Sequence, residues 1–448
     1  AKDLEEVPSA SLENLLQGHM AGVEVSNISG SPGGGGTRIN IRGYNSLLSE
    51  SQTDGTPLYV IDGVPVHSFT SPVTGTNTLA EIDPSTIESV EVLKDAASAA
   101  LYGSRASNGV ILITTKQGKT GRGKFSANVS YSYSILPETP TQTGGHLERI
   151  ANLNKFRNLR AAYGSWQTGI YKMPESYRDA YHQNGAYDYF WNNGYPLTEY
   201  HIATAKPLQD SLNPFYNNST NWWKYCFDAG KILNANLQAS GGTETIKYMV
   251  GAGWYDETGI MLGSNFKRAN ILTNLNVVPR ANLNIDARLY LAYTDRSRGA
   301  ANTSFTNASK IEGLTVDPKS NLSILPGSGE IEKETLKQLN ESSEKNITYR
   351  IRASLAVAYE FVKGLKLSSS LSMDFSEGKR NSFIPSYLDA VNNLSISTGS
   401  ISSGTLFSNE NLLVYNKSIR NNHNMEILLG LSYLREAKDQ FSGSGKGS

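Results

Sequence analysis

From residue 125 onward, apolar and polar side chains alternate one by one over long stretches of this chain. In the segment 125–135, every second residue from Phe125 to Ile135 is apolar or aromatic, and serine or asparagine stands between them. The segment 347–361 repeats the pattern, although alanine and arginine also occupy its second face. Because successive side chains of a β-strand point to opposite faces, this period of two predicts strands with one apolar and one largely hydrophilic face.

Further segments of the same kind bring the number of predicted strands to nine. Each is roughly 10 residues long, the length that a tilted strand needs to cross a bilayer. Short polar connections join some of them and long ones, 136–230 and 297–345, join others, which is the layout of an outer-membrane barrel. Periodicity alone also allows a water-soluble β-sandwich. The further segments are 232–240, 246–256, 269–277, 283–293, 365–375, 406–415 and 425–433.

The residues before about position 120 follow a mixed α/β pattern instead. A short amphipathic helix is predicted over 11–17, because the run ends at Gly18, and a small-residue helix over 95–106, which Asp95 would cap. Short apolar runs between glycine and proline predict strands around them. These strands are 22–26, 37–42, 58–61, 90–93 and 110–115.

Composition excludes several functions. The chain has 41 basic and 41 acidic residues, so it lacks the positive charge of a nucleic-acid-binding protein. No apolar run reaches the about 20 residues of a spanning helix, so membrane residence must come from strands. The 24 tyrosines against 13 phenylalanines suit aromatic anchors at a membrane interface.

Catalytic and metal chemistry find little support. The 6 histidines are scattered and pair with no second ligand, and the single cysteine, Cys226, has no general base beside it. We therefore predict no enzyme, no catalytic residue, no metal site and no cofactor. An envelope hydrolase with a Ser/His/Asp set from distant segments stays open as an alternative.

Several motifs of the first 120 residues resemble the plug domain of TonB-dependent outer-membrane transporters, most closely the SusC-like (SusC/RagA) group. They are Ile41-Arg42-Gly43, the run 57–66 around Asp62-Gly63, the run 89–95, and the run 99–116 that contains Tyr102-Gly103. The resemblance implies a large antiparallel membrane β-barrel, of which about nine strands are present, with an α+β plug domain inside the lumen. Complete barrels of this kind close with roughly 22 strands, so we expect an interior piece of a longer protein.

The resemblance also implies a division of the chain. We expect the plug domain over 1–121 without its first segment and without the TonB box. The amino-terminal part of the barrel, with long extracellular loops, would cover 122–441, and 442–448 would be a loop.

Site residues follow from the same resemblance. Two plug loops are expected to face the substrate, and two arginines, Arg42 and Arg105, are expected to pair with carboxylates between plug and barrel. Gly43, Asp62, Gly63, Tyr102 and Gly103 belong to the motifs themselves. The expected substrate-facing residues are Tyr44, Asn45, Ser46, His67, Phe69, Thr76 and Asn77.

The implied function is TonB-dependent import of a nutrient oligomer, an oligosaccharide or a peptide, across the outer membrane of a Gram-negative bacterium. The expected partners are TonB, a SusD-like surface lipoprotein that closes the barrel like a lid, the substrate and outer-membrane lipid, but no nucleic acid. The alternatives are a siderophore or cobalamin receptor without a lid, a surface signalling or adhesion barrel, and a soluble β-sandwich binding module.

Overall fold

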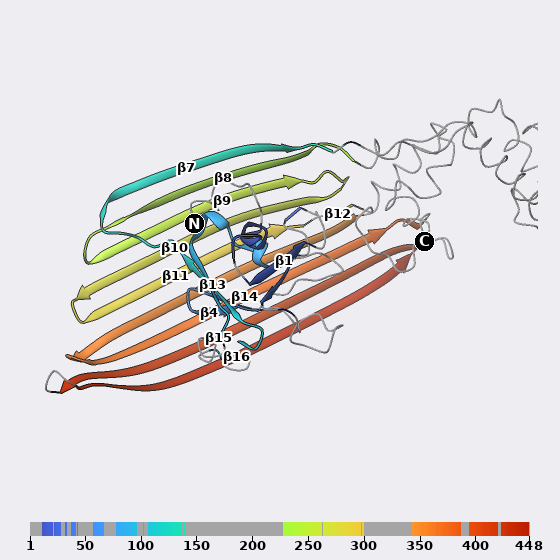
Figure 1. Ribbon diagram of the computed structural model, residues 1–448. Helices are drawn as coiled ribbons and strands as arrows, with labels where there is room; N and C mark the ends of the chain where they lie inside the picture. Colours follow the sequence, from blue (N-terminus) through green and yellow to red (C-terminus); the bar gives the residue numbers. More distant parts are fainter. Residues whose placement is uncertain are drawn as a thin grey trace, which may run out of the picture.

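The structure is a computed structural model that divides into a large sheet and a small amino-terminal domain (Figure 1). It describes residues 11–20, 22–27, 32–33, 37–41, 43, 57–66, 78–95, 102, 106–136, 138, 227–261, 263–296, 298–299, 343–386, 394–419 and 423–447.

The large sheet is antiparallel throughout its main path. Its strand order is β16-β15-β14-β13-β11-β10-β9-β8-β7, and the short β12 pairs with β13 beside this path. Neighbours in sequence are therefore neighbours in space, as in an up-and-down barrel wall. The strands are β7 (Gly121–Ser134), β8 (Gly230–Gly242), β9 (Ile246–Thr258), β10 (Asn265–Arg280), β11 (Leu283–Asp295), β12 (Arg298–Gly299), β13 (Ser343–Val362), β14 (Leu365–Ile384), β15 (Ser395–Ile419) and β16 (His423–Gly447).

The sheet has two chemically different faces. Its outward face carries exposed apolar side chains such as Phe125, Ile271 and Leu355, whereas buried polar residues such as Asn274 and Arg350 lie on the opposite, inward face. A sheet that is apolar toward its surroundings and polar toward its interior has the pattern of a membrane barrel and not of a water-soluble sandwich.

Aromatic rings mark two levels of the outward face. Tyr293 and Tyr349, from the neighbouring strands β11 and β13, have ring centroids 5.4 Å apart, and further along β13 the rings of Tyr359 and Phe361 are 4.8 Å apart. The ten residue steps from Tyr349 to Tyr359 span about 33 Å of strand. At a tilt of about 40° this is roughly 25 Å across a membrane, the height of the apolar band of outer-membrane barrels. Among the described residues, no helix has the length and apolar character to span a bilayer.

Among the described residues, the amino-terminal domain contains two small sheets, one helix and two 3-10 turns. β1 (Val23–Asn27) pairs with β2 (Thr37–Ile41), and a second sheet has the order β4-β3-β6-β5, with only β3 and β6 parallel. Buried Leu12, Ile39, Ile61, Leu79 and Ile111 form much of its core. The remaining elements are α2 (Leu12–Leu16), β3 (Leu58–Ile61), β4 (Val64–Val66), η1 (Thr78–Glu81), η2 (Pro84–Thr86), β5 (Ile87–Leu93) and β6 (Val110–Thr115).

The predicted fold class, an antiparallel barrel wall with an α+β domain on its inner side, is confirmed. Two short strands escaped prediction, β4 and the two-residue β12. β4 contains Pro65 and lies at the edge of its sheet, where a missing N–H group is tolerated. The helix expected over 95–106 falls largely outside the described residues.

The prediction of a loop over 442–448 is wrong for residues 442–447, and residue 448 lies outside the described residues. β16 continues to Gly447, which pairs with Ser395 of β15. The glycine- and serine-rich sequence suggested a loop, but the ladder of a sheet is made by backbone groups, and β15 supplies a partner along this whole stretch.

Candidate functional site

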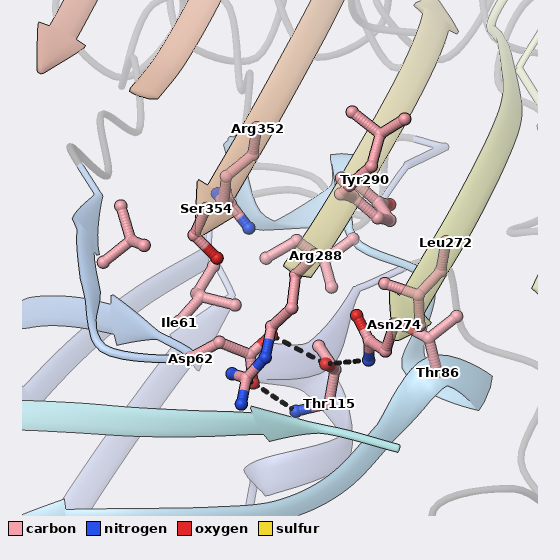
Figure 2. Close-up of a pocket in the computed structure, with 13 residues that line it drawn as sticks. Ile61, Asp62, Thr86, Thr115, Leu272, Asn274, Arg288, Tyr290, Arg352 and Ser354 are labelled. Atoms are coloured by element: carbon pink, nitrogen blue, oxygen red, sulfur yellow. Dashed lines mark hydrogen bonds and ion pairs between the residues drawn. The ribbon is translucent and has the colours of Figure 1, made fainter. Parts of the chain in front are cut away.

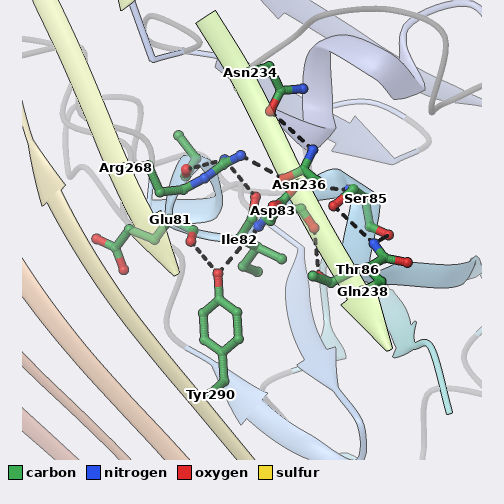
Figure 3. Close-up of polar contacts among 11 residues, drawn as sticks. Glu81, Ile82, Asp83, Ser85, Thr86, Asn234, Asn236, Gln238, Arg268 and Tyr290 are labelled. Carbon is green, nitrogen blue, oxygen red and sulfur yellow. Dashed lines mark hydrogen bonds and ion pairs between the residues drawn. The ribbon is translucent and has the colours of Figure 1, made fainter. Parts of the chain in front are cut away.

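The amino-terminal domain contacts the inward face of the sheet mainly through residues 78–86, which we call the docking segment (Figure 3). The segment is a pair of 3-10 turns fixed by Asp83. The Asp83 side chain accepts a hydrogen bond from the Ser85 amide at 2.9 Å, and its carbonyl accepts one from the Thr86 hydroxyl at 2.6 Å. These local bonds are typical of an aspartate before Pro-Ser, and they hold the carbonyl groups of the segment toward the sheet.

Arg268 of β10 and Tyr290 of β11 bind the backbone of the docking segment. Nη1 of Arg268 donates to the carbonyls of Ala80 and Ile82, at 2.9 and 3.0 Å, and Nη2 lies 3.5 Å from the Asp83 carboxylate. The Tyr290 hydroxyl donates to the Glu81 carbonyl at 2.5 Å and accepts from the Asp83 amide at 3.3 Å. The Arg268 side chain is only 1% exposed, so each of these bonds is shielded from water.

Arg350 of β13 joins the docking segment to the sheet through two carboxylates. Its Nη1 donates to Oε2 of Glu81 at 2.9 Å, while Nε and Nη2 form a bidentate pair with Asp374 of β14 at 2.9 and 2.6 Å. All three side chains are buried. Removal of one partner from such a buried pair leaves an uncompensated charge and typically costs about 3–5 kcal/mol.

A second contact is centred on the turn between β3 and β4 (Figure 2). Asp62 and Gly63 have φ angles of 52° and 85°, the left-handed geometry of a two-residue hairpin turn that Asp-Gly adopts readily. The Asp62 carboxylate accepts hydrogen bonds from the Thr115 amide at 2.9 Å and the Thr115 hydroxyl at 2.7 Å, and it pairs with Nη1 of Arg288 from β11 at 3.0 Å.

Strands β8 and β10 extend this second contact. Nδ2 of Asn274 donates to the Thr115 hydroxyl at 3.0 Å and to the Lys116 carbonyl at 2.7 Å. Gln238 of β8 donates to the Ser85 carbonyl at 3.0 Å and accepts a long bond from Lys116 Nζ at 3.5 Å. The contact therefore binds the end of β6 and the docking segment to the same wall.

A third contact lies at Gly33. Its amide donates to the Glu257 carboxylate of β9 at 3.0 Å, and its φ angle is 79°. A β-carbon at this position would approach the ring of Phe266 to 2.5 Å. Phe266 packs against Tyr255 and Ala80, so only glycine lets the chain pass this closely.

A small cavity lies between the Asp62 turn and the inward face. Its volume is about 20 Å³, enough for one water molecule. Asn274, Arg288, Tyr290 and Arg352 contribute to its lining. Within the part of the chain that the structure describes, Nε and Nη2 of Arg352 and Oδ1 of Asn274 have no hydrogen-bond partner, although they are buried.

Only some of the predicted site residues can be located. Asp62 and Gly63 form the turn at the second contact, and Gly43 is exposed with a φ angle of 89°. Tyr102 is half-buried, and burial, followed by the negative charge of Glu410 on β15, raises the pKa of its hydroxyl. The remaining predicted residues lie outside the described part, so their roles stay predictions: Arg42, Tyr44, Asn45, Ser46, His67, Phe69, Thr76, Asn77, Gly103 and Arg105.

Sequence reasoning missed the ionic contacts that the structure describes, in which carboxylates of the amino-terminal domain meet arginines of the sheet. A signal was available for two of them, because Arg288 and Arg350 occupy the hydrophilic faces of predicted strands, where serine or asparagine is more usual. The described residues contain no group of three or more His, Cys, Asp or Glu side chains placed to hold a metal ion.

Comparison with protein families and curated proteins identifies relatives over nearly the whole chain. The family model for the TonB-dependent Receptor Plug Domain matches residues 1–110. TonB-dependent receptor P26 of Formosa agariphila is 28% identical over 454 aligned positions, covering 97% of this chain and 39% of P26. TonB-dependent receptor SusC of Bacteroides thetaiotaomicron is 31% identical over 264 positions, covering 59% of this chain and 21% of SusC. The chain thus spans less than half the length of these relatives.

Among solved structures, the RagAB peptide importer in its "closed-closed" state is similar over 100% of this chain and 48% of its own, with a TM-score of 0.71 and 24% identity. A likeness at this level of identity concerns the fold. It agrees with a plug domain held against the inner side of an antiparallel barrel wall.

Proposed function

We propose that this chain, which carries the plug domain and barrel strands of a SusC-like TonB-dependent receptor, belongs to a protein that imports a nutrient oligomer across the outer membrane. The cargo would be an oligosaccharide or a peptide. TonB would supply the force that displaces part of the plug, so the import step would need no cofactor. The outward apolar face and its two aromatic levels support an outer-membrane location.

The observation that carries this proposal is the polar character of the plug contacts. The docking segment is attached by hydrogen bonds and ion pairs to Arg268, Tyr290 and Arg350. Such bonds are strong while water is excluded, but water can replace them as the segment moves into the lumen. A plug attached in this way stays closed at rest and opens under force without unfolding the barrel.

Two parts of the proposal extend beyond the described residues. The loops that contain Tyr44 to Ser46 and His67 to Asn77 would contact the cargo from the outer side of the plug. A SusD-like surface lipoprotein would close the barrel above them, a partnership supported by the homology to SusC. RagAB is described as a peptide importer, so peptide stands beside oligosaccharide as the cargo class.

A covalent crosslink between the docking segment and the barrel sheet tests the import step. The Ser85 hydroxyl lies 3.4 Å from Nε2 of Gln238, so the double variant Ser85→Cys/Gln238→Cys of the full-length receptor can be joined by a short thiol crosslinker. A strain that depends on the receptor for growth on one oligosaccharide or peptide should stop growing after crosslinking. Each single-cysteine variant, treated in the same way, is the control. Growth that continues with a quantitatively crosslinked plug would contradict import through this barrel.

Native mass spectrometry of the receptor, extracted from the outer membrane in mild detergent, tests the partnership. A copurifying lipoprotein, with residual mass that matches a glycan or a peptide, would support the lidded importer. Recovery of the receptor alone would instead favour a receptor without a lid.

A further inference from the structure

Four arginines from three neighbouring strands lie together on the inward face beneath the plug. We call them the arginine wall: Arg268 of β10, Arg288 of β11, and Arg350 and Arg352 of β13. Three of them are almost completely buried, and Arg288 is 22% exposed. Guanidinium groups stay charged in proteins, so each needs a negative group nearby in the closed state.

The plug supplies most of that negative charge. Three carboxylates of the plug pair with the arginine wall: Asp83 with Arg268, Asp62 with Arg288, and Glu81 with Arg350. A fourth carboxylate that pairs with these arginines, Asp374, belongs to the sheet itself. Withdrawal of the plug would therefore remove three of these four carboxylates and leave all four arginines in place. Four guanidinium groups would then be uncovered, with Asp374 as the carboxylate that still contacts them among the described ion pairs.

Arg352 adds a second, independent observation. Its side chain is 7% exposed and borders the cavity at the Asp62 turn, yet Nε and Nη2 donate no hydrogen bond to any described residue. Its nearest carboxylate oxygen, on Asp374, is 3.7 Å away, and Asp374 is already bound at both oxygens by Arg350. Arg352 thus retains two donors for a further acceptor.

We propose that the arginine wall binds carboxylate groups of an acidic cargo as the plug withdraws, so that cargo carboxylates replace Glu81, Asp83 and Asp62. A guanidinium binds a carboxylate through two parallel hydrogen bonds, the geometry that Arg350 already makes with Asp374. This exchange would keep the buried arginines paired with negative groups while the path through the barrel is open. This inference rests on the proposed import function and narrows its cargo to acidic oligomers.

The charge preference of the arginine wall can be tested without cargo or TonB. The measurement is the ion selectivity of the full-length receptor in a planar lipid bilayer. The variant Glu81→Gln/Asp83→Asn/Asp62→Asn removes the plug charges but keeps the cap and the turn, because asparagine suits both positions. Under a KCl gradient, we expect channels whose reversal potential shifts toward that of chloride. The control Glu24→Gln/Glu88→Gln/Glu91→Gln makes the same change in plug charge away from the wall, and it should stay closed.

Substitution of Arg352 tests the ion-selective path without changing the plug contacts. No hydrogen bond joins Arg352 to the plug among the described contacts. Added to the triple variant, Arg352→Gln should weaken the chloride preference and Arg352→Lys should preserve it. Lys379→Gln, which removes one positive charge from the outward face, should leave the preference unchanged. If the triple variant does not assemble, Glu81→Gln alone allows the same comparison.

Block of the channel current by added oligomers identifies which class of cargo supplies the carboxylates. Glutamate oligomers and galacturonate oligomers, added at matched length, distinguish an acidic peptide from an acidic glycan, with neutral glucose oligomers as the control. Block by either acidic probe that Arg352→Gln relieves would support the inference.

Three results would overturn it: channels without chloride preference, a preference that Arg352→Gln does not alter, or no current from the charge-neutralised plug. These results are independent of import in cells, so a failure of the proposed function would be seen separately, in the crosslinking experiment.

Discussion

Nη1 of Arg350 lies 2.9 Å from Oε2 of Glu81, although the two residues are 269 positions apart in the sequence. One belongs to a strand of the barrel wall and the other to the docking segment of the plug. Because both side chains are buried, this ion pair ties the position of the plug directly to one register position of β13.

Neutralisation of this pair should loosen the docking segment. Glu81→Gln leaves Arg350 bound to Asp374, so we expect a loss of about 2 kcal/mol in the local opening free energy, below the about 3–5 kcal/mol of a fully broken buried pair. Hydrogen exchange of the amides of residues 78–86 measures this change. Glu377→Gln, which removes an outward carboxylate paired with Lys379, should change exchange by less than about 1 kcal/mol. Equal protection in Glu81→Gln and wild type would contradict the assignment.

Loss of the Tyr290 hydroxyl should also weaken docking. Tyr290→Phe leaves the Glu81 carbonyl and the Asp83 amide without this partner in a buried site, which costs about 1–3 kcal/mol. Faster exchange at Asp83 and at its neighbours would report the loss. Tyr293→Phe changes a ring of the outward face three positions further along β11, and it should leave the docking segment unaffected.

Substitution of Gly33 should be destabilising for two separable reasons. Gly33→Ala combines a positive φ angle with a collision against Phe266. The double variant Gly33→Ala/Phe266→Ala relieves the collision but keeps the backbone strain. A double-mutant cycle on thermal unfolding in detergent should therefore give a favourable coupling energy, about 0.5–3 kcal/mol for residues in contact. Strict additivity of the two changes in unfolding free energy would mean that positions 33 and 266 do not contact each other.

At the Asp62 turn, two substitutions separate backbone geometry from charge. Asp62→Asn keeps a residue that tolerates the φ angle of 52° but removes the charge that faces Arg288, whereas Asp62→Ala loses both. We expect Asp62→Ala to be the more destabilising by about 1 kcal/mol or more, as for strained non-glycine positions. Chemical denaturation of the two variants provides the comparison, and identical midpoints would exclude a role for turn geometry.

The barrel wall was predictable because its signal is local. Alternation over 347–361 reflects two faces of one strand, so the strand and its apolar side can be inferred without knowing the neighbours. The same logic failed at 442–448, where glycine and serine carry no alternation and the strand depends on pairing with β15.

The plug contacts were not predictable in the same way. Arg268 meets Ala80 across 188 positions, and no period in either segment records that encounter. The hydrophilic face of β13 identified Arg350 as pointing inward, but not whether it would meet water, cargo or plug. Asp62 was selected as part of a motif, while its partner Arg288 stands on the hydrophilic face of the predicted strand 283–293, a position that does not identify its partner.

Asp374 fixes the orientation of the Arg350 guanidinium independently of the plug. It belongs to β14 and not to the plug, and it holds two sides of the Arg350 guanidinium while Nη1 is directed at Glu81. If the plug withdraws as proposed, this bidentate contact would remain and keep the guanidinium in its orientation. A returning plug would then meet an arginine that is already positioned for Glu81, so docking would not require the side chain to be ordered again.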